Sequence, residues 1–495
     1  MKVLLAGYNV DSEALNELKT MRPDLGNITP ETLSAAYARI SRDPRSVDKL
    51  RAASREEVER ARRSNQNIIF KMGHHSVAEH AVFNFDIIGV SRLAIEEIEK
   101  FRLCSYTEKS QRYIKLGDDY ILPDEVRKSG QKRKFLETVK AQNALYNFLF
   151  KKLRPFFFDK YKALAQNPRK HALLNGWAME DARYVLSLAT LGQLGLTANA
   201  RNLEFLIRRF AAKNLVEIEE LNQKIYALAK EVAPSIILFT EASDFDTRTY
   251  TDLQEEIGHD SEKPPRFADK TAAVVDHTPD GDTRLIAALI HTSSALSYKG
   301  CLQKAEAMDD RERKNLVLAA FRHMEFFDAV LREFEYVDLT FDLVVSATCF
   351  AQLKRHRIAT LTAQRYEPEL GVMVPPSVKE VGAEKQFLDL IDRTNAAYTA
   401  LKKNMDSGAE YILTNSHRRR VLIKLNAREL YHISRLREDS AAQWDIRNIV
   451  QAMSRKAKEA MPLTFLLIGG KDAYPEIYRR IFAKLPKAIP PKPGQ

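Results

Sequence analysis

The chain has 495 residues, of which 45% are hydrophobic and 29% are charged, a composition typical of a soluble globular protein with more than one domain. Its 77 basic residues exceed its 66 acidic residues and give a net charge of +11, which favours an anionic partner such as a nucleotide, a polyphosphate cofactor or a nucleic acid. No apolar run reaches the roughly 18 residues of a membrane-spanning helix, so we expect a cytoplasmic protein without a membrane partner.

The three cysteines, Cys104, Cys301 and Cys349, lie far apart in the sequence. They form neither a disulfide framework nor a Cys-x-x-Cys metal clip, and we expect them to be reduced and buried. Three histidines cluster in residues 74–80, but no cysteine or further histidine motif completes a zinc shell. The sequence therefore predicts no metal site.

The N-terminal part of the chain alternates short strands with amphipathic helices. Strands are expected where apolar residues alternate, at residues 3–6 and 82–88. Helices are expected where apolar residues recur at helical spacing, at residues 30–40, 45–67 and 91–102. The polar residues 103–113 are predicted to form a loop.

A long helical region follows at residues 128–230. Its amphipathic segments are expected at residues 135–153, 182–191 and 203–228. Charged residues and prolines then cluster in residues 252–284, which favours a linker with a strand embedded at residues 272–275.

Features of the first half recur in the same order in the second half. A strand followed by a turn at residues 4–11 resembles residues 274–280, and the tripeptide Asn-Ala-Arg at residues 199–201 recurs at residues 426–428. A Val-Ser pair also precedes an arginine at the same spacing in both halves. Shared order and spacing indicate an internal duplication.

A basic triplet marks the second half. Arg355, His356 and Arg357 follow an apolar run at residues 341–353. Consecutive helical residues are separated by about 100°, so these three side chains cannot serve one salt bridge, and we interpret them as groups directed at an extended, electron-rich ligand. A charged helix end stabilised by the helix macrodipole is the alternative.

The corresponding segment of the first half, residues 100–113, is rich in hydroxyl and charged side chains. Ser110 and Arg112 are suited to a phosphate, because arginine can bind it with two hydrogen bonds and serine adds a donor. Glu108 can accept a hydrogen bond from a sugar hydroxyl or a base N–H. An ordinary polar loop is the alternative, although it leaves the duplication unexplained.

These motifs together resemble the flavin-dependent thymidylate synthases. The chain reads His-His-Ser-Val-Ala-Glu-His at residues 74–80, Gly-Val-Ser-Arg at residues 89–92 and Leu-Arg-Glu-Asp-Ser-Ala-Ala-Gln-Trp at residues 436–444. With the two loops and both Asn-Ala-Arg tripeptides, the resemblance covers most of each half. It implies an α+β fold made of two tandem copies, each a small antiparallel or mixed sheet with long helices.

The resemblance also implies the limits and assembly of the two copies. We expect the first copy at residues 1–255, a linker at residues 256–271 and the second copy at residues 272–495. Enzymes of this family are normally homotetramers of single-copy chains. A chain with two copies is therefore expected to form a homodimer that imitates the tetramer.

The resemblance assigns a role to each matching residue. The positions that hold the deoxyuridylate are Glu108, Ser110, Arg112 and Arg183. The positions that contact the flavin are His74, Ser76, Glu79, Asn199, Arg201, Arg357, Asn426, Arg428 and His432. The positions assigned to catalysis are Arg355, His356, Arg357 and Arg437.

Each half has lost elements that the other half keeps. Lys-Phe-Arg at residues 100–102 replaces the Arg-His-Arg of the second half. In the second half the nucleotide loop is two residues shorter, Ala363 replaces the serine, and Glu410 stands where Arg183 stands in the first half. Its first histidine motif is reduced to residues 332–335. We therefore expect an active site shared between the two repeats.

The predicted function is the reductive methylation of dUMP to dTMP, with FAD as cofactor and NADPH and methylene-tetrahydrofolate as co-substrates. One alternative is a diverged flavoenzyme that acts on another pyrimidine nucleotide. A non-catalytic protein that binds a nucleotide or RNA is the alternative from a different class, although a nucleic-acid partner is not the leading expectation. The run Arg418-Arg419-Arg420 is interpreted as a solvated helix face, with contact to a cofactor phosphate as the alternative.

Overall fold

The computed structural model describes residues 1–11, 13, 15–16, 29–39, 47–56, 59, 62–63, 75–111, 119–258, 272–405 and 407–490. Two predicted site residues, His74 and Arg112, lie outside these ranges, as do residues 259–271 of the predicted linker. In the ranges that are described, no helix is both long enough and apolar enough to cross a membrane.

A four-stranded antiparallel sheet forms in the first half of the chain. Its strands are β1 (Lys2–Tyr8), β2 (Val82–Ser91), β3 (Ser105–Glu108) and β4 (Leu191–Asn199), in the spatial order β1-β2-β4-β3. On β2, Phe83, Phe85 and Ile87 are buried while the residues between them are exposed. This alternation is the pattern of a strand with one face on a core.

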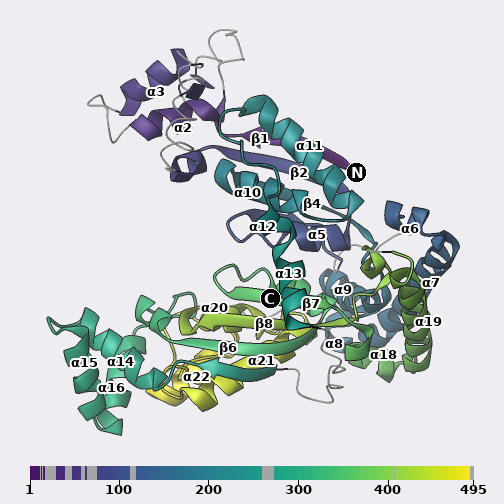
Figure 1. Ribbon diagram of the computed structural model, residues 1–495. Helices are drawn as coiled ribbons and strands as arrows, with labels where there is room; N and C mark the ends of the chain where they lie inside the picture. Colours follow the sequence, from purple (N-terminus) through teal and green to yellow (C-terminus); the bar gives the residue numbers. More distant parts are fainter. Residues whose placement is uncertain are drawn as a thin grey trace. The chain divides into compact units, whose positions relative to one another are not determined.

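A second sheet repeats this arrangement. Its strands are β5 (Ala272–His277), β6 (Asp338–Ser346), β7 (Thr360–Tyr366) and β8 (Arg418–Asn426), in the order β5-β6-β8-β7 and again antiparallel. Figure 1 shows β6 beside β8, and β2 beside β4. Two sheets with the same order of equivalent strands agree with the predicted α+β architecture in two copies.

Equivalent helices accompany the two sheets. In the first copy these are α5 (Arg92–Ile98) after β2, and α10 (Ala200–Ala211) and α11 (Val216–Val232) after β4. In the second copy they are α17 (Ala347–Leu353) after β6, and α20 (Ala427–Arg437) and α21 (Trp444–Ala460) after β8. Serine caps the first helix of each set, because the Ser91 hydroxyl accepts from Ala94 N and the Ser346 hydroxyl accepts from Cys349 N. Such caps satisfy backbone N–H groups that have no partner inside the helix.

The remaining helical segments are distributed over both halves. The first half contains α2 (Pro30–Arg39), α3 (Val47–Glu56), η3 (His75–His80), α6 (Asp124–Lys128), α7 (Lys132–Lys160), α8 (Lys162–Ala165), η4 (Pro168–Lys170), α9 (His171–Ala182), η5 (Arg183–Val185), α12 (Asp244–Thr247) and α13 (Thr249–Ile257). The second half contains α14 (Gly281–Thr292), α15 (Tyr298–Ala307), α16 (Asp310–Phe321), η6 (Arg332–Tyr336), η7 (Pro368–Leu370), α18 (Pro376–Glu380), α19 (Glu384–Lys402), η8 (Ala409–Ile412) and α22 (Tyr474–Phe482).

Several sequence predictions of local structure are wrong. The expected helix at residues 182–191 is a short 3-10 turn that leads into β4, and the expected helix at residues 203–228 is two helices, α10 and α11. Part of the expected loop at residues 103–113 forms the edge strand β3. In each case pairing with β4 or packing on the sheet overrides the local pattern.

Packing divides the chain into two compact units that are not simply its two halves. The first unit comprises Met1–Tyr146, Leu186–Lys263 and Leu388–Leu413, and the second comprises Asn147–Val185, Pro264–Phe387 and Thr414–Gln495. Each unit therefore contains one segment from the other half of the sequence. This grouping concerns packing, and the sequence limits of the two copies stay a prediction.

A buried carboxylate, Glu217, binds the segment Leu388–Leu413, which belongs to the first unit although it comes from the second half of the sequence. The Tyr411 hydroxyl and the Ser91 hydroxyl donate to the same oxygen of Glu217, Oε2, at 2.7 and 2.6 Å. Ser91 N donates to the other oxygen at 2.7 Å, and Ala189 N donates to the carbonyl of Tyr411 at 3.0 Å. Burial raises the pKa of Glu217, so these donors offset the cost of placing a carboxylate in the core.

The second unit has equivalent hydrogen bonds to the segment Asn147–Val185, which comes from the first half of the sequence. The Tyr184 hydroxyl donates to Oδ2 of Asp445 at 3.0 Å, and the Ser346 hydroxyl donates to the same oxygen at 2.5 Å. Ser416 N donates to the carbonyl of Tyr184 at 3.0 Å. Each unit thus uses a serine helix cap, an acidic residue of a long helix and a tyrosine from the other half.

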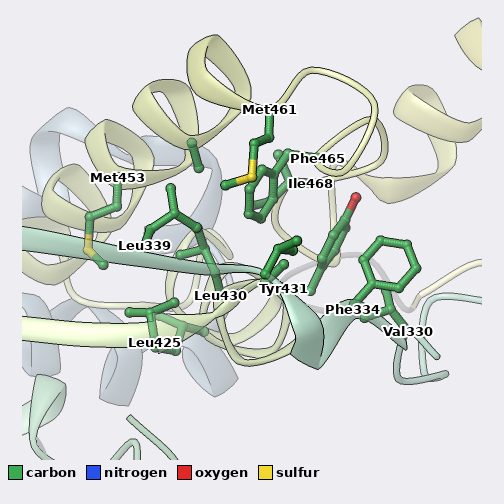
Figure 2. Packing of buried hydrophobic residues seen from close by; sticks show 14 of the residues in the cluster. Val330, Phe334, Leu339, Leu425, Leu430, Tyr431, Met453, Met461, Phe465 and Ile468 are labelled. Atoms are coloured by element: carbon green, nitrogen blue, oxygen red, sulfur yellow. The ribbon is translucent and has the colours of Figure 1, made fainter. Parts of the chain in front are cut away.

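The core of the second unit is built around Tyr431 (Figure 2). Its ring stacks on Phe465 with centroids 5.8 Å apart and meets Phe334 edge-on at 5.9 Å. Its hydroxyl donates to the carbonyl of Thr464 at 2.9 Å, so the polar end of the buried ring is satisfied. Cys301 and Cys349 lie in the same cluster, and all three cysteines are free and buried, as predicted.

Candidate functional site

The two Asn-Ala-Arg tripeptides occupy the same structural position, between the end of a strand and the start of a helix. Asn199 caps α10 by accepting from Asn202 N at 3.0 Å, and Asn426 caps α20 by accepting from Glu429 N at 2.8 Å. The cap fixes the first turn of each helix. Because the predicted cofactor-binding arginine lies in this first turn, the cap also fixes the position of its backbone.

Each of these arginines pairs with a glutamate from the 3-10 helix that precedes the second strand. Arg201 Nη1 lies 2.6 Å from Oε1 of Glu79, and Arg428 Nη1 lies 2.7 Å from Oε1 of Glu335. Glu335 thus occupies the position of Glu79, although its segment shares no histidine motif with the first copy. The sequence signal for Glu335 is its position shortly before β6, which matches the position of Glu79 before β2. The signal is easy to miss because the histidines around Glu79 have no counterpart around Glu335.

His356 is the buried middle residue of Arg355-His356-Arg357, which we call the basic loop of the second unit. Arg437 Nε donates to His356 Nε2 at 3.0 Å, and Oε1 of Glu429 lies 3.9 Å from His356 Nδ1. Burial, followed by the charges of Arg437, His432 and Arg355, lowers the pKa of His356 to about 3. The ring is therefore neutral at neutral pH, with its proton on Nδ1 because Nε2 accepts a hydrogen bond.

The surroundings of His356 carry both signs of charge. Burial raises the pKa of Glu429 to about 7, and Arg428 opposes this shift. The ring of His432 lies edge-on to His356 with centroids 6.1 Å apart, and its pKa is lowered by partial burial and by the charges of Arg437 and Arg428. Of these two groups it is therefore Glu429 that titrates near neutral pH, whereas His356 stays neutral.

Arg355 and Arg357 are exposed on either side of the buried His356. Arg355 Nε donates to the carbonyl of Ala351 at 3.2 Å, which directs the guanidinium along the end of α17. The loop thus presents two cations at the surface above a neutral imidazole. The structure brings together the predicted residues Arg355, His356, Arg357, Arg428, His432 and Arg437 in the second unit.

The first unit has an aromatic cluster at the equivalent positions. Phe101 follows Ser91 at the spacing by which His356 follows Ser346, and Phe205 and Phe210 follow Asn199 as His432 and Arg437 follow Asn426. Phe101 meets Phe205 and Phe210 edge-on, each with ring centroids 5.7 Å apart. The geometry of the second unit is kept, but its polar groups are replaced by hydrocarbon.

The predicted nucleotide-binding residues are divided between the units. Glu108 and Ser110 are half-buried in the first unit, where Glu108 Oε2 lies 3.9 Å from Nη1 of the buried Arg92. Arg183 is buried in the second unit, and its carbonyl accepts from Asn415 Nδ2 at 3.0 Å. Ser76 is exposed in the first unit.

Arg183 lies among other ionisable groups. Asp181 accepts hydrogen bonds from Ser377 Oγ and Trp444 Nε1, while burial raises its pKa to about 7. Arg183 lowers the pKa of both Asp181 and Asp445, whose pKa burial raises. The counterpart of Arg183 is the half-buried Glu410 in the first unit. The second unit thus carries a guanidinium where the first carries a carboxylate.

The predicted solvated helix face at residues 418–420 is wrong, because these residues begin β8. Arg419 is buried between the rings of Phe350 and Tyr366, at 4.6 and 4.3 Å from the ring centroids. Its Nε donates to the carbonyl of Gln364 at 2.7 Å. Strand alternation sends this arginine to the face opposite its neighbours.

Comparison with known proteins follows the two copies. The family model described as thymidylate synthase complementing protein matches residues 25–235 and, separately, residues 273–463. A flavin-dependent thymidylate synthase of Clostridium tetani is 29% identical over 218 residues, which cover 43% of this chain and 83% of that protein. A protein of the same name from Geobacter sulfurreducens is 33% identical over 172 residues, 34% of this chain and 65% of its own.

A further relative matches the chain across both copies. The UPF0159 protein of Chlamydia muridarum is 23% identical over 425 residues, which cover 82% of this chain and 80% of that protein. The two-copy length is therefore shared with another protein. Because the family model matches most of the chain in two separate segments, the chain belongs to the thymidylate synthase complementing protein family, the family of the flavin-dependent thymidylate synthases, and contains two tandem copies of its unit.

Proposed function

We propose that the chain catalyses the reductive methylation of dUMP to dTMP, with FAD as cofactor and NADPH and methylene-tetrahydrofolate as co-substrates. The observation that carries the proposal is the cationic cluster of the second unit. There burial keeps His356 neutral and Arg437 donates to its ring, while Arg355 and Arg357 flank it at the surface.

The donor set of this cluster fits a reduced flavin. Its three arginines carry only hydrogen-bond donors, and the pyrimidine end of a reduced flavin is anionic. A bound flavin would supply the hydride for the methylation. The protein side would stabilise negative charge with preorganised guanidinium groups, an effect worth about 3 kcal/mol per well-placed donor in other enzymes.

Arg183, in the segment Asn147–Val185 of the second unit, supports a nucleotide site in that unit. Arg183 comes from the first half of the sequence but belongs to the second unit, whereas Glu410 belongs to the first. A guanidinium attracts the phosphate of dUMP and a carboxylate repels it. We therefore propose Arg183 as a nucleotide contact of the second unit. Glu108, Ser110 and Arg112 are proposed as nucleotide contacts of the first copy, and Asn199, Arg201, Asn426 and Arg428 as cofactor contacts of their own copies. We also propose that the chain forms a homodimer.

The test is the reaction itself. The purified chain is mixed with FAD, NADPH, methylene-tetrahydrofolate and dUMP, flavin uptake is followed by absorbance, and dTMP is measured by mass spectrometry. We expect flavin uptake and dTMP. A chain that takes up no flavin is not a flavoenzyme, and a chain that binds FAD and oxidises NADPH without forming dTMP acts on a different substrate.

A matched pair of variants locates the reaction. Arg357→Ala is expected to abolish dTMP formation. Arg480→Ala removes a guanidinium that is 72% exposed on α22 and pairs with Glu476, and it is expected to leave dTMP formation unchanged. Equal activity of the two variants would remove the basic loop from the reaction.

A further inference from the structure

The segment between two matching tyrosines differs in length between the copies. Tyr146 and Tyr398 each end an Asn-Ala-x-Tyr motif, and Tyr184 and Tyr411 each donate to a buried carboxylate. Tyr146 and Tyr184 are 38 residues apart, whereas Tyr398 and Tyr411 are 13 residues apart. The helix α19 ends four residues after its tyrosine, but α7 continues for 14 residues and is followed by α8, η4 and α9. The first copy therefore carries a segment that the second copy lacks.

Residues 151–170 of this segment are strongly basic. They include seven basic residues and one acidic residue, so they provide more than half of the net charge of +11. The helix α19 carries three basic and three acidic residues, so the fold that the two copies share does not require this charge. Six of the seven basic residues are exposed, and we call them the basic surface of the second unit: Lys151, Lys152, Arg154, Lys160, Lys162 and Arg169.

Few carboxylates balance the basic surface. Two of its lysines form ion pairs, Lys160 with Glu380 at 2.6 Å and Lys162 with Asp159 at 3.3 Å. Within the ranges that the structure describes, the other four residues of the surface form no ion pair. Like charges that are not balanced repel one another and attract an anionic ligand. The surface therefore suits a ligand that carries several negative charges.

Aromatic rings lie among these cations. Lys152 Nζ lies 5.1 Å from the centroid of Phe148, and the guanidinium carbon of Arg154 lies 5.2 Å from the centroid of Phe158. Phe148 is 38% exposed and Tyr161 is 39% exposed. Proteins that bind single strands combine a positive surface with aromatic side chains on which bases stack. Because the faces of the bases are covered in a duplex, such rings favour a single strand.

The basic surface is longer than a mononucleotide. Phe148, Lys151 and Lys152 share one face of α7, because residues three and four apart on a helix are neighbours. From Phe148 to Lys160 the helix rises about 18 Å, whereas successive nucleotides of a DNA strand are about 3.4 Å apart along the duplex axis. A ligand that contacts both ends of this surface is therefore a polymer.

We propose that the basic surface of the second unit binds single-stranded nucleic acid, with its lysines and arginines on the phosphates and with Phe148 and Tyr161 stacked on bases. DNA and RNA share these two features, and the experiment compares them. The proposal goes beyond the proposed function, because none of these residues is a proposed nucleotide or cofactor contact. It holds whether or not the chain turns over dUMP.

The experiment measures the fluorescence anisotropy of labelled oligo-dT and oligo-rU with the full chain. The strands have about 16 nucleotides, the upper end of usual site sizes, and a DNA duplex of the same length is the comparison. We expect at least one strand to bind more tightly than the duplex. We also expect its affinity to fall as salt rises from about 50 to 200 mM, because bound phosphates release counterions.

A triple variant tests the phosphate contacts. Lys151→Gln/Lys152→Gln/Arg154→Gln should weaken the strand about 10- to 100-fold near 0.1 M salt. It should also reduce the slope of log affinity against log salt by about 2, since each phosphate contact contributes about 0.7 for a single strand. The control, Lys299→Gln/Lys304→Gln/Arg311→Gln, removes the same number of exposed cations from α15 and α16 of the same unit and should change neither quantity.

Two further measurements test the rings and the location. Phe148→Ala should weaken the strand about 5- to 150-fold, the usual effect of removing one stacking ring, and should leave the duplex unchanged. A strand that contains 4-thiouridine is crosslinked to the parent chain by light, and mass spectrometry should find the crosslinks in residues 147–170. The crosslinking needs no variant, so it decides the location even if a variant does not fold.

Several results would overturn the proposal. These are a chain that binds neither strand, a duplex that binds as tightly as the strands, equal effects of the two triple variants, or crosslinks outside residues 147–170. Displacement of the strand by excess dUMP would also overturn it, because the strand would then occupy the nucleotide site.

Discussion

In the second unit, Arg437 donates from Nε to Nε2 of His356 across 3.0 Å. This contact fixes the tautomer of the imidazole and places a positive charge beside a ring that burial already keeps neutral. An arginine and a histidine that are far apart in the sequence thus act as one group. Arg355 and Arg357 provide the positive charge at the surface, and the buried His356 between them is neutral.

Replacement of Arg437 tests this relationship. Arg437→Gln removes a charge that lowers the pKa of His356, so the pKa of His356 should rise, as measured by NMR of the labelled imidazole. If the guanidinium stabilises developing negative charge, dTMP formation should also fall by roughly 10²- to 10³-fold. Arg480→Gln on α22 serves as the control and should change neither quantity. An unchanged His356 pKa in Arg437→Gln would show that burial alone sets it.

The buried His417 predicts a pH dependence of stability. Burial lowers its pKa to about 4, and its Nδ1 accepts from Thr414 N at 2.9 Å. Because the unfolded chain binds a proton at higher pH than the folded one, the contribution of His417 is complete above about pH 6.5 and is lost as the pH falls towards 4. Its full size is about 3 kcal/mol.

Comparison with His417→Gln isolates this effect, since glutamine can still accept a hydrogen bond. Asp181 and Glu429 act in the opposite sense, because their raised pKa values of about 7 make the folded chain less stable as the pH rises towards 7. We therefore compare urea unfolding of the two proteins at pH 7 and pH 5. The parent should lose more stability on acidification than the variant, and equal losses would contradict the assignment.

The two buried tyrosine–carboxylate bonds should contribute similarly to stability. Tyr411→Phe and Tyr184→Phe each remove a donor to a buried carboxylate, Glu217 in the first unit and Asp445 in the second. Each should lower the free energy of unfolding by about 1–3 kcal/mol. Tyr250→Phe, at a position 71% exposed, is the control and should have no effect in urea titration. A loss in only one variant would show that the two units do not depend on this bond alike.

The duplication and the general course of the strands could be predicted from the sequence, because apolar alternation and repeated motifs are local signals. The strand predicted at residues 272–275 lies in β5, and the repeated Asn-Ala-Arg tripeptides stand at the start of equivalent helices. Loss of different elements in the two halves was also visible. It predicts an active site that needs residues of both halves, and this stays a prediction; by packing, Arg183 of the first half belongs to the second unit.

The exchange of segments could not be predicted from the same signals. An amphipathic pattern shows that one face of a helix is buried, but it does not show which residues cover it. Nothing in the sequence distinguishes Tyr184 and Tyr411 from other aromatic residues. Only the fold shows that each donates a hydrogen bond to a carboxylate far away in the chain. The sequence predicts only a lost Arg-His-Arg motif at Phe101, whereas the structure shows Phe101 packed on Phe205 beside a pocket.

Arg419 and Arg420 provide the last prediction, because two adjacent arginines on β8 have opposite environments. Arg419 is stacked between Phe350 and Tyr366 and donates to the carbonyl of Gln364, while Arg420 Nη1 pairs with Asp342 at 2.8 Å near the surface. Lysine cannot replace a planar, stacked guanidinium, so Arg419→Lys should lower the free energy of unfolding by about 1–3 kcal/mol. Lysine can still pair with Asp342, so Arg420→Lys should change it by less than about 0.5 kcal/mol. Urea titration of the two variants compares them directly, and equal effects would mean that the stacked position of Arg419 contributes nothing beyond its charge.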